Sequence, residues 1–396
     1  MKINVLSTTA ADTLQAAREI QSQIADEGHP PDFTALHFSA AYDTETLLEA
    51  ARGMTNGTLH GSTSCLGVMS DKGMQSTDGF GAGAFCIWDS EGDYGTAMRP
   101  LDDDPEGAAR SAARDALKLA GRAGEAPDIV WLSTSPGTEE AVLRGVQAEL
   151  GENVPILGGS AADNDVSGQW CVFDRDNATG NGVVVSVLFP SGEVSFAYHN
   201  GYAPTEHSGV VTRSEGRRLI EIDNQLAGEV YDQWTDGKVL PADAADGPSS
   251  ILSESTFTPL GRYFDSVGDV PYFLLAHPAT LNGDGSIELF ADVTEGDRLT
   301  LMQGSVKSLT ERAGKVASLA TRVGELDPSE VEGALVVYCG GCMLAVQGSM
   351  GTVVSGINTA LNEAPFLGVF TFGEQGMVMD GQNRHGNLMI SCIVFS

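Results

Sequence analysis

The sequence has 396 residues, of which 54 are acidic and 22 are basic, so its net charge is −32. Such a charge repels phosphate backbones and anionic lipid surfaces, which excludes nucleic acid and membrane surfaces as partners. The 42% of hydrophobic and 19% of charged residues are typical of a globular protein. The length predicts two α/β units of roughly 150 to 200 residues each.

Three features of the sequence predict a cytoplasmic protein. Residues 1–13 contain only a brief apolar stretch and lack the features of a signal peptide. No apolar run approaches the ~18 residues that a membrane span requires. Six cysteines in a chain of this length do not form a dense disulfide framework and indicate reduced thiols.

One pattern of strand, helix and glycine turn occurs three times in chain order. The copies begin at strand candidates 35–38, 129–132 and 334–337. The helices that follow are capped by Thr44, start near Thr138, and include Val353 to Leu361. Glycine turns come next, at 61–63, 158–160 and 368–374, and apolar strand candidates follow them at 82–88, 183–189 and 388–395. The fold class predicted is α/β, with layered mixed sheets, helices, and two related halves built from repeated β-α-β-β units.

Further elements lie between the copies. Asp104 and Pro105 start an alanine-rich helix that ends near Gly121, and another helix is expected at 306–323. A strand is predicted at 218–224, and the turn at 283–285 indicates a hairpin that leads into 287–290.

A ligand site is predicted where the glycine turns follow the strands, because several loops converge at that edge of an α/β sheet. Bare N–H groups and hydroxyls in such turns can bind a carboxylate or a similar anion. Glu374 is a candidate for binding a ligand amine, and Arg384 is the nearest basic candidate. The predicted ligand-binding residues are Ser62, Thr63, Cys65, Gly158, Gly159, Ser160, Asp163, Cys339, Gly340, Gly373, Glu374 and Arg384. The alternative is that the glycines serve only tight turns against neighbouring elements.

Several of these segments resemble the FIST-domain family. HGSTSCLGVMSDKG at 60–73 and PILGGSAADND at 155–165 are similar to the N-terminal FIST domain. ALVVYCGGC at 334–342 and GVFTFGEQG at 368–376 resemble the C-terminal FIST domain in order and spacing. The resemblance implies a FIST N-like sensory domain at 1–205 and a FIST C-like sensory domain at 206–396.

The resemblance also implies a function. FIST domains resemble sensors of small ligands, with amino acids suggested, and they stand alone or are fused to output modules. The two sensory domains take up the whole sequence, so the resemblance implies a cytoplasmic, non-catalytic signal-transduction sensor. It would relay its signal to a separate protein such as a histidine kinase.

One departure from the family pattern raises a redox alternative. Where similar proteins carry Cys-x-x-Arg, this sequence has Cys339, Gly340, Gly341 and Cys342, so the arginine that could pair with an anionic ligand is missing. A CxxC between a strand and a helix is also how thiol oxidoreductases lower a thiol pKa. A thiol redox protein that uses Cys339 and Cys342 is therefore one alternative function.

A haem-binding nitric-oxide sensor of the FIST type is a second alternative, and haem is the one cofactor considered. His199, His207, His277 and His385 lie near predicted turns, and no CxxCH attachment motif is present. An ordinary enzyme is not expected, because the GxSxG, HExxH and P-loop motifs are absent.

Overall fold

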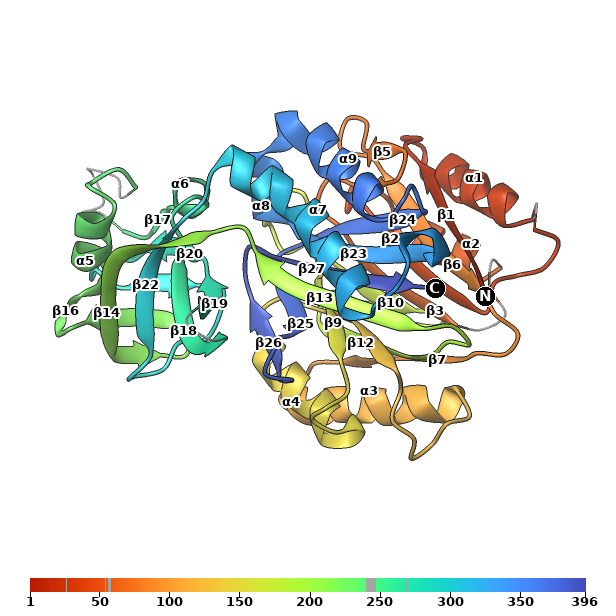
Figure 1. The fold of residues 1–396 in the computed structure, drawn as a ribbon, viewed down its shortest axis with the longest axis horizontal. Coiled ribbons are helices and arrows are strands. Elements are labelled where there is room, and N and C mark those ends of the chain that lie inside the picture. Colours follow the sequence, from red (N-terminus) through yellow and green to blue (C-terminus); the bar gives the residue numbers. More distant parts are fainter. Residues whose placement is uncertain (26, 54, 56–57, 240–246, 268–269) are drawn as a thin grey trace.

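The structure is a computed structural model that describes residues 1–25, 27–53, 55, 58–239, 247–267 and 270–396. It has a mixed α/β fold with three six-stranded sheets and one nine-stranded sheet, which confirms the predicted fold class. Figure 1 shows the nine-stranded sheet standing to one side of the other three sheets and their helices. We call the nine-stranded sheet with its helices, residues 203–303, the lateral sheet, and the remainder the three-sheet body.

The predicted pattern does occur three times, and its copies share one topology. The first unit contains β1 (Lys2–Thr8), α1 (Thr13–Ala25), β2 (Phe33–Phe38), α2 (Thr44–Ala51), β3 (Leu59–Thr63) and β6 (Ala82–Trp88). The second contains β7 (Asp93–Pro100), α3 (Pro105–Leu119), β8 (Ile129–Thr134), α4 (Glu139–Leu150), β9 (Ile156–Ser160) and β12 (Gly182–Phe189). The third contains β13 (Val194–Asn200), α7 (Val306–Val323), β23 (Gly333–Cys339), α8 (Gly340–Ala345), α9 (Met350–Ala360), β24 (Phe366–Thr371) and β27 (Met389–Phe395).

Strand pairing is the same in all three units. The strands on either side of the second helix are parallel neighbours: β2 with β3, β8 with β9, and β23 with β24. The last strand of each unit lies antiparallel between the first two, as β6 does between β1 and β2. The helices lie outside the sheets, with α3 and α4 on one side and α7 and α9 on another (Figure 1).

Each unit also gives a short hairpin to the sheet of another unit. The hairpins are β4 (Val68–Ser70) with β5 (Gly73–Gln75), β10 (Val172–Asp174) with β11 (Ala178–Thr179), and β25 (Glu374–Met377) with β26 (Asn383–Gly386). The hairpin of the first unit pairs with β24 in the sheet of the third unit. That of the second unit pairs with β3 of the first, and that of the third unit pairs with β9 of the second. The glycine turns that lead into these hairpins therefore cross from one sheet to the next.

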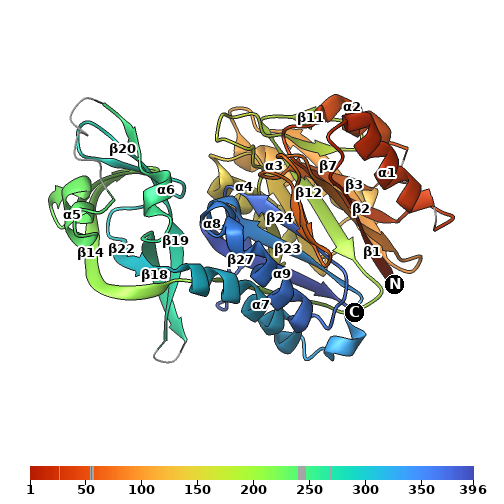
Figure 2. The ribbon, with the colours of Figure 1, turned by 90° about the horizontal axis from the view of Figure 1, so that it is seen from above.

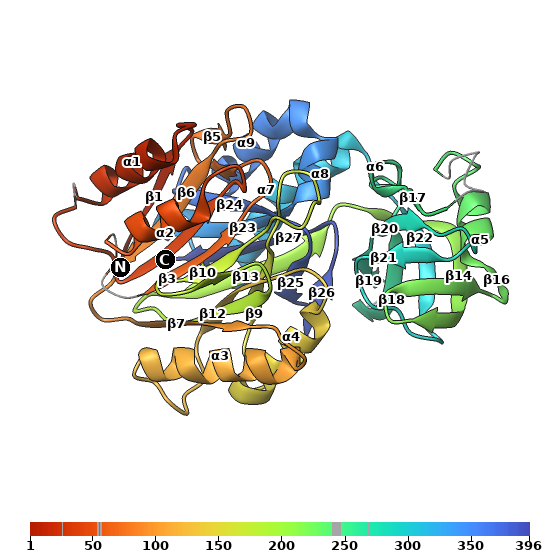
Figure 3. The same cartoon turned by 180° about the vertical axis from the view of Figure 1, so that it is seen from behind.

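The lateral sheet is inserted between β13 and α7. Figures 2 and 3 show it beside the body from two further directions. Its elements are β14 (Ala203–Glu215), β15 (Arg218–Ile222), β16 (Gln225–Leu226), α5 (Ala227–Trp234), β17 (Ser249–Ser250), α6 (Leu252–Ser255), β18 (Leu260–Val267), β19 (Val270–Ala276), β20 (Pro278–Leu281), β21 (Ile287–Leu289) and β22 (Arg298–Gln303). The predicted hairpin into 287–290 is the one that β20 and β21 form.

Local sequence explains why the body packs closely. The strands of its core, such as β12 and β23, are buried along their whole length, which is why they appear in the sequence as continuous apolar runs. Helix α3 starts as predicted, with Asp104 accepting a hydrogen bond from Gly107 and Pro105 in the first turn. The cap of α2 differs from the prediction, because Asp43 and not Thr44 accepts the N-terminal hydrogen bond. None of the described helices is long and apolar enough to cross a membrane.

Candidate functional site

The three glycine turns meet in a ring of backbone hydrogen bonds. The Cys65 N–H donates to Phe370 O at 3.1 Å, which joins the first unit to the third. The Ala162 N–H donates to Thr63 O at 3.2 Å, and the Phe372 N–H donates to Ser160 O at 3.1 Å. Each turn is therefore bonded to the next one, and we call this place the junction.

Close packing explains the glycines of the junction. A Cβ on Gly158 would lie 1.9 Å from Leu132 O, and one on Gly159 would lie 2.4 Å from a Thr371 methyl. Both positions are crowded by protein atoms, so a side chain there would displace the neighbouring strands. These glycines, with Gly340 and Gly373 nearby, bring the turns together and are not open to a ligand on that side.

Glu374 and Cys339 lie buried beside the junction. The Glu374 carboxyl accepts hydrogen bonds from the Thr371 hydroxyl at 2.8 Å and the Met389 N–H at 2.9 Å. Burial, with Cys339 adjacent, raises the pKa of Glu374 well above its ordinary value. The hydrogen bond with Cys342, together with burial, raises the pKa of the Cys339 thiol. Burial therefore favours the uncharged form of both groups.

A cavity of about 210 Å³ lies next to the junction, between the lateral sheet and the body. The lateral sheet contributes Leu252, Ser253, Thr256, His277 and Phe290 to its wall. The body contributes Val166, Cys339, Gly341, Leu344, Ala345, Phe372 and Asn387. Cys339 is the predicted site residue that lines this cavity. Concave, mostly apolar sites between two structural units are where small ligands commonly bind.

The polar groups of the cavity wall mainly bond to one another. The His277 Nε2 lies 3.0 Å from Leu252 O, and the Thr256 hydroxyl donates to the same oxygen at 2.9 Å. The Asn387 side chain accepts from the His277 backbone N–H at 3.1 Å. Burial lowers the pKa of His277 to about 4, so its imidazole is neutral at pH 7.

Haem does not fit this cavity. Its volume of about 210 Å³ is below the ~300 to 1,000 Å³ of sites for drug-sized ligands. His277, the histidine in the wall, has its Nε2 occupied by the contact to Leu252 O.

Asp163 holds the loop that forms part of the cavity mouth. Its carboxylate accepts backbone hydrogen bonds from Val166 at 2.6 Å and from Gly168 and Gln169 at 2.7 and 2.8 Å. Val166 has a φ of +60°, which is rare for a β-branched residue, and it is 45% exposed. Asp163 thus positions an apolar side chain at the mouth without lining the cavity itself.

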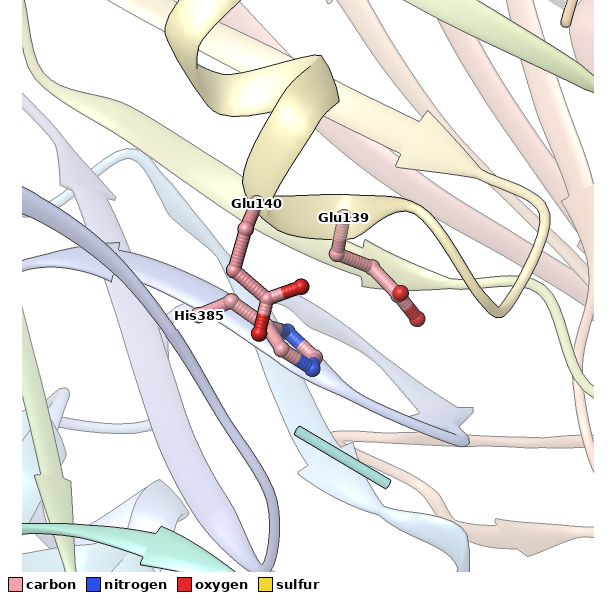
Figure 4. A group of neighbouring side chains, drawn as sticks. All are labelled: Glu139, Glu140 and His385. Carbon is pink, nitrogen blue, oxygen red and sulfur yellow. The ribbon is translucent and has the colours of Figure 1, made fainter. Parts of the chain in front are cut away.

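A charged cluster joins the second unit to the lateral sheet. Arg217, in the turn after β14, donates to Glu139 at 2.6 Å and to Glu140 at 2.8 Å, and it also pairs with Asp292 at 3.3 Å. Figure 4 shows both glutamates at the start of α4, with His385 of β26 beside them. Burial opposes their ionisation, but His385 and Arg217 outweigh it and lower the pKa of both glutamates, that of Glu140 to about 2.

This cluster was missed at the sequence level. One carboxylate oxygen each of Glu139 and Glu140 and one ring nitrogen of His385 lie within 4.8 Å of one another, which is close enough for a metal ion. The Arg217 guanidinium already pairs with both carboxylates, so the arrangement is that of an ion-paired contact. Ser160, a predicted ligand residue, donates its hydroxyl to Glu139 at 2.7 Å and so belongs to this cluster. Only Glu139 and Glu140 are neighbours in sequence, so no motif indicates the cluster.

Ser62 and Arg384 lie away from the cavity. The Ser62 hydroxyl is 3.0 Å from His37 Nδ1, within a buried polar network that includes His60 and Ser133. Arg384 pairs with Asp380 at 3.5 Å and lies over the Phe264 ring. Thr63, Cys65, Gly158, Gly159, Ser160, Gly340, Gly373 and Glu374 gather at the junction.

Comparisons with known proteins agree with the segments noted in the sequence. A FIST N domain model matches residues 32–225, and a FIST C domain model matches residues 227–377. The uncharacterized protein MJ1623 of Methanocaldococcus jannaschii is 24% identical over 208 residues. That match covers 47% of this chain and 37% of the relative, so the chain corresponds to little more than a third of that protein.

Solved structures give only weak matches. Cyanuric acid hydrolase from A. caulinodans superposes with a TM-score of 0.41 and 10% identity, covering 99% of this chain and 98% of that one. Phosphoribosylformylglycinamidine synthase II from Thermotoga maritima gives a TM-score of 0.23 and 11% identity, covering 99% and 71%. Similarities of this size support no conclusion about activity.

Proposed function

Because the chain belongs to the FIST family, whose domains are generally small-ligand sensory domains of signalling proteins, we propose that it is a cytoplasmic, non-catalytic sensor. It binds a small metabolite in the cavity between the lateral sheet and the body. It then passes the signal to a separate protein, such as a histidine kinase. Amino acids are the ligand class that the family resemblance implies.

The position of the cavity is the observation that carries this proposal. Its wall combines Thr256 and His277 of the lateral sheet with Cys339, Phe372 and Asn387 of the body. A ligand that touches both parts favours the arrangement in which both sets of contacts form. Binding would then shift the population of arrangements and change the surface presented to the partner.

The same groups make a catalytic or redox role a poor second candidate. A nucleophilic thiol requires a lowered pKa, whereas the hydrogen bond with Cys342 and burial raise that of Cys339. The pKa of Glu374 is raised well above its ordinary value, and both of its oxygens accept hydrogen bonds from the protein. Neither group is prepared for chemistry at neutral pH.

A thermal-shift screen of the purified protein against amino acids, other small metabolites and haemin tests the proposal. We expect at least one metabolite to raise Tm in the wild type and in the control variant Ala123→Trp, whose site is exposed and lies outside the cavity wall. Ala345→Trp should abolish that shift, because the indole would fill the cavity.

The remaining outcomes count against the proposal. Equal shifts in Ala345→Trp and the wild type would place the ligand elsewhere. A Soret band with haemin would favour the haem alternative. Disulfide reductase turnover that is lost in Cys339→Ser would favour the redox alternative.

A further inference from the structure

The wall of the cavity carries no net charge. Among the described residues that line it there is no aspartate, glutamate, lysine or arginine. Cys339 and His277 are its titratable members, and both are in their neutral form at pH 7. The nearby Arg217 is already paired with Glu139, Glu140 and Asp292. A charged ligand would therefore lose its hydration without meeting a counter-charge, which is unfavourable.

The apolar part of the wall suits a flat or branched hydrocarbon group. Phe290 and Phe372 supply aromatic surface, and Leu252 and Ala345 supply aliphatic surface. Val166 and Leu344 extend this character to the mouth, where they are 45% and 46% exposed. Exposed apolar side chains that gather around an opening are typical of a binding site for apolar groups.

The neutral imidazole of His277 offers a hydrogen-bond acceptor to a ligand. The His277 Nε2 donates to Leu252 O, so its Nδ1 is the acceptor nitrogen of the neutral ring. Nδ1 has no hydrogen-bond partner among the residues that the structure describes. A ligand that carries one hydroxyl or N–H group would satisfy it.

The size of the cavity limits the ligand further. An engineered protein cavity of ~150 Å³ takes up benzene, and this cavity has about 210 Å³. A six-membered ring with a short substituent is therefore of suitable size.

We propose that the cavity binds small, uncharged, mainly apolar molecules with a single hydrogen-bond donor, such as a ring with one hydroxyl or N–H group. This inference rests on the proposed sensory function and narrows its ligand class. A cavity of this kind would not select free amino acids, because their charged carboxylate and ammonium groups would find no partner in the wall.

Four probes of similar size but different charge test the inference. Benzyl alcohol is neutral, benzoate is an anion, benzylamine is a cation at pH 7, and phenylalanine carries both charges. Calorimetric titrations should show benzyl alcohol binding at least tenfold more tightly than each of the others. Ala345→Trp should abolish this binding, and Ala123→Trp should retain it.

A charge placed at the mouth gives a second test. Leu344→Lys should raise the affinity for benzoate at least tenfold while changing that for benzyl alcohol by less than threefold. Leu344 is exposed, so the lysine should be tolerated. The control is Leu119→Lys on α3, where the leucine is 67% exposed and lies outside the cavity wall.

The two proposals can fail separately. If benzoate or phenylalanine binds in the cavity at least as tightly as benzyl alcohol, the neutral-ligand inference is wrong, whereas the sensory proposal stands. If none of the four probes binds, the neutral-ligand inference is again overturned. The sensory proposal is then judged by the metabolite screen.

Discussion

Glu374 is a buried carboxyl group whose protonated form the fold favours. It is fully buried, and its raised pKa follows from burial and the adjacent Cys339. In the unfolded chain the same carboxyl ionises near pH ~4.3. Stability is therefore unaffected by this group below that pH and decreases as pH rises towards the folded-state pKa.

Replacing Glu374 with glutamine should remove this pH dependence. Relative to the wild type, Glu374→Gln should gain stability as pH rises above ~4.3, by up to about 1.4 kcal/mol for each pH unit in which one proton differs. Urea unfolding at several pH values measures the difference. The exposed Glu91→Gln serves as the control and should follow the wild type. If the Glu374→Gln variant instead loses stability relative to the wild type as pH rises, this account of the buried carboxyl is contradicted.

At the scale of elements, Arg217 connects the lateral sheet to helix α4. Its side chain is 17% exposed, and that of Glu139 is 1% exposed. Removing one member of a buried ion pair leaves the other charge without compensation. Arg217→Met should therefore lower the free energy of unfolding by about 3 kcal/mol. Lys315→Met, at the exposed pair with Glu311, should cost less than ~1 kcal/mol.

The pH dependence of this contact has the opposite sign to that of Glu374. The lowered pKa of Glu139 and Glu140 means that their contribution is present above pH ~4.3 and is lost as pH falls towards about 2. Chemical unfolding should therefore show that the difference in free energy of unfolding between the wild type and Arg217→Met becomes smaller as pH falls through that range. A constant difference from pH 7 to pH 2.5 would mean that the arginine acts through packing alone.

Elements with a strong local signal were predictable from the sequence. The helix expected at 306–323 is observed as Val306–Val323, and the strand expected at 183–189 is observed as Gly182–Phe189. Apolar periodicity and capping residues decide such elements locally. The sequence also indicated that the turns after β3, β9 and β24 belong together.

Long-range contacts were not predictable in the same way. The exchange of hairpins between units depends on which sheet edge each hairpin meets, and local patterns do not encode that choice. Arg217 and Glu139 lie 78 residues apart, and the cavity combines residues from 166 to 387. For the same reason the sequence does not show the contacts that Ser62 makes with His37 and Arg384 makes with Asp380, and their role as ligand residues stays a prediction.

The whole molecule combines the three-sheet body with a lateral sheet whose strand β19 shares a hydrophobic core with the body. The body is closed by the junction, where three units exchange backbone hydrogen bonds. The cavity and the Arg217 contact both lie between the two parts. The division of the chain at residue 205 stays a prediction, and the FIST N match at 32–225 extends past it to the start of β16.

Hydrogen–deuterium exchange with the metabolite that raises Tm most tests the central claim most directly. The claim is that one ligand contacts the lateral sheet and the body together. We expect the ligand to slow exchange both in 252–256 and in 339–345, with no such effect in Ala345→Trp. Slower exchange on only one side of the cavity, or only in segments remote from it, would contradict the claim.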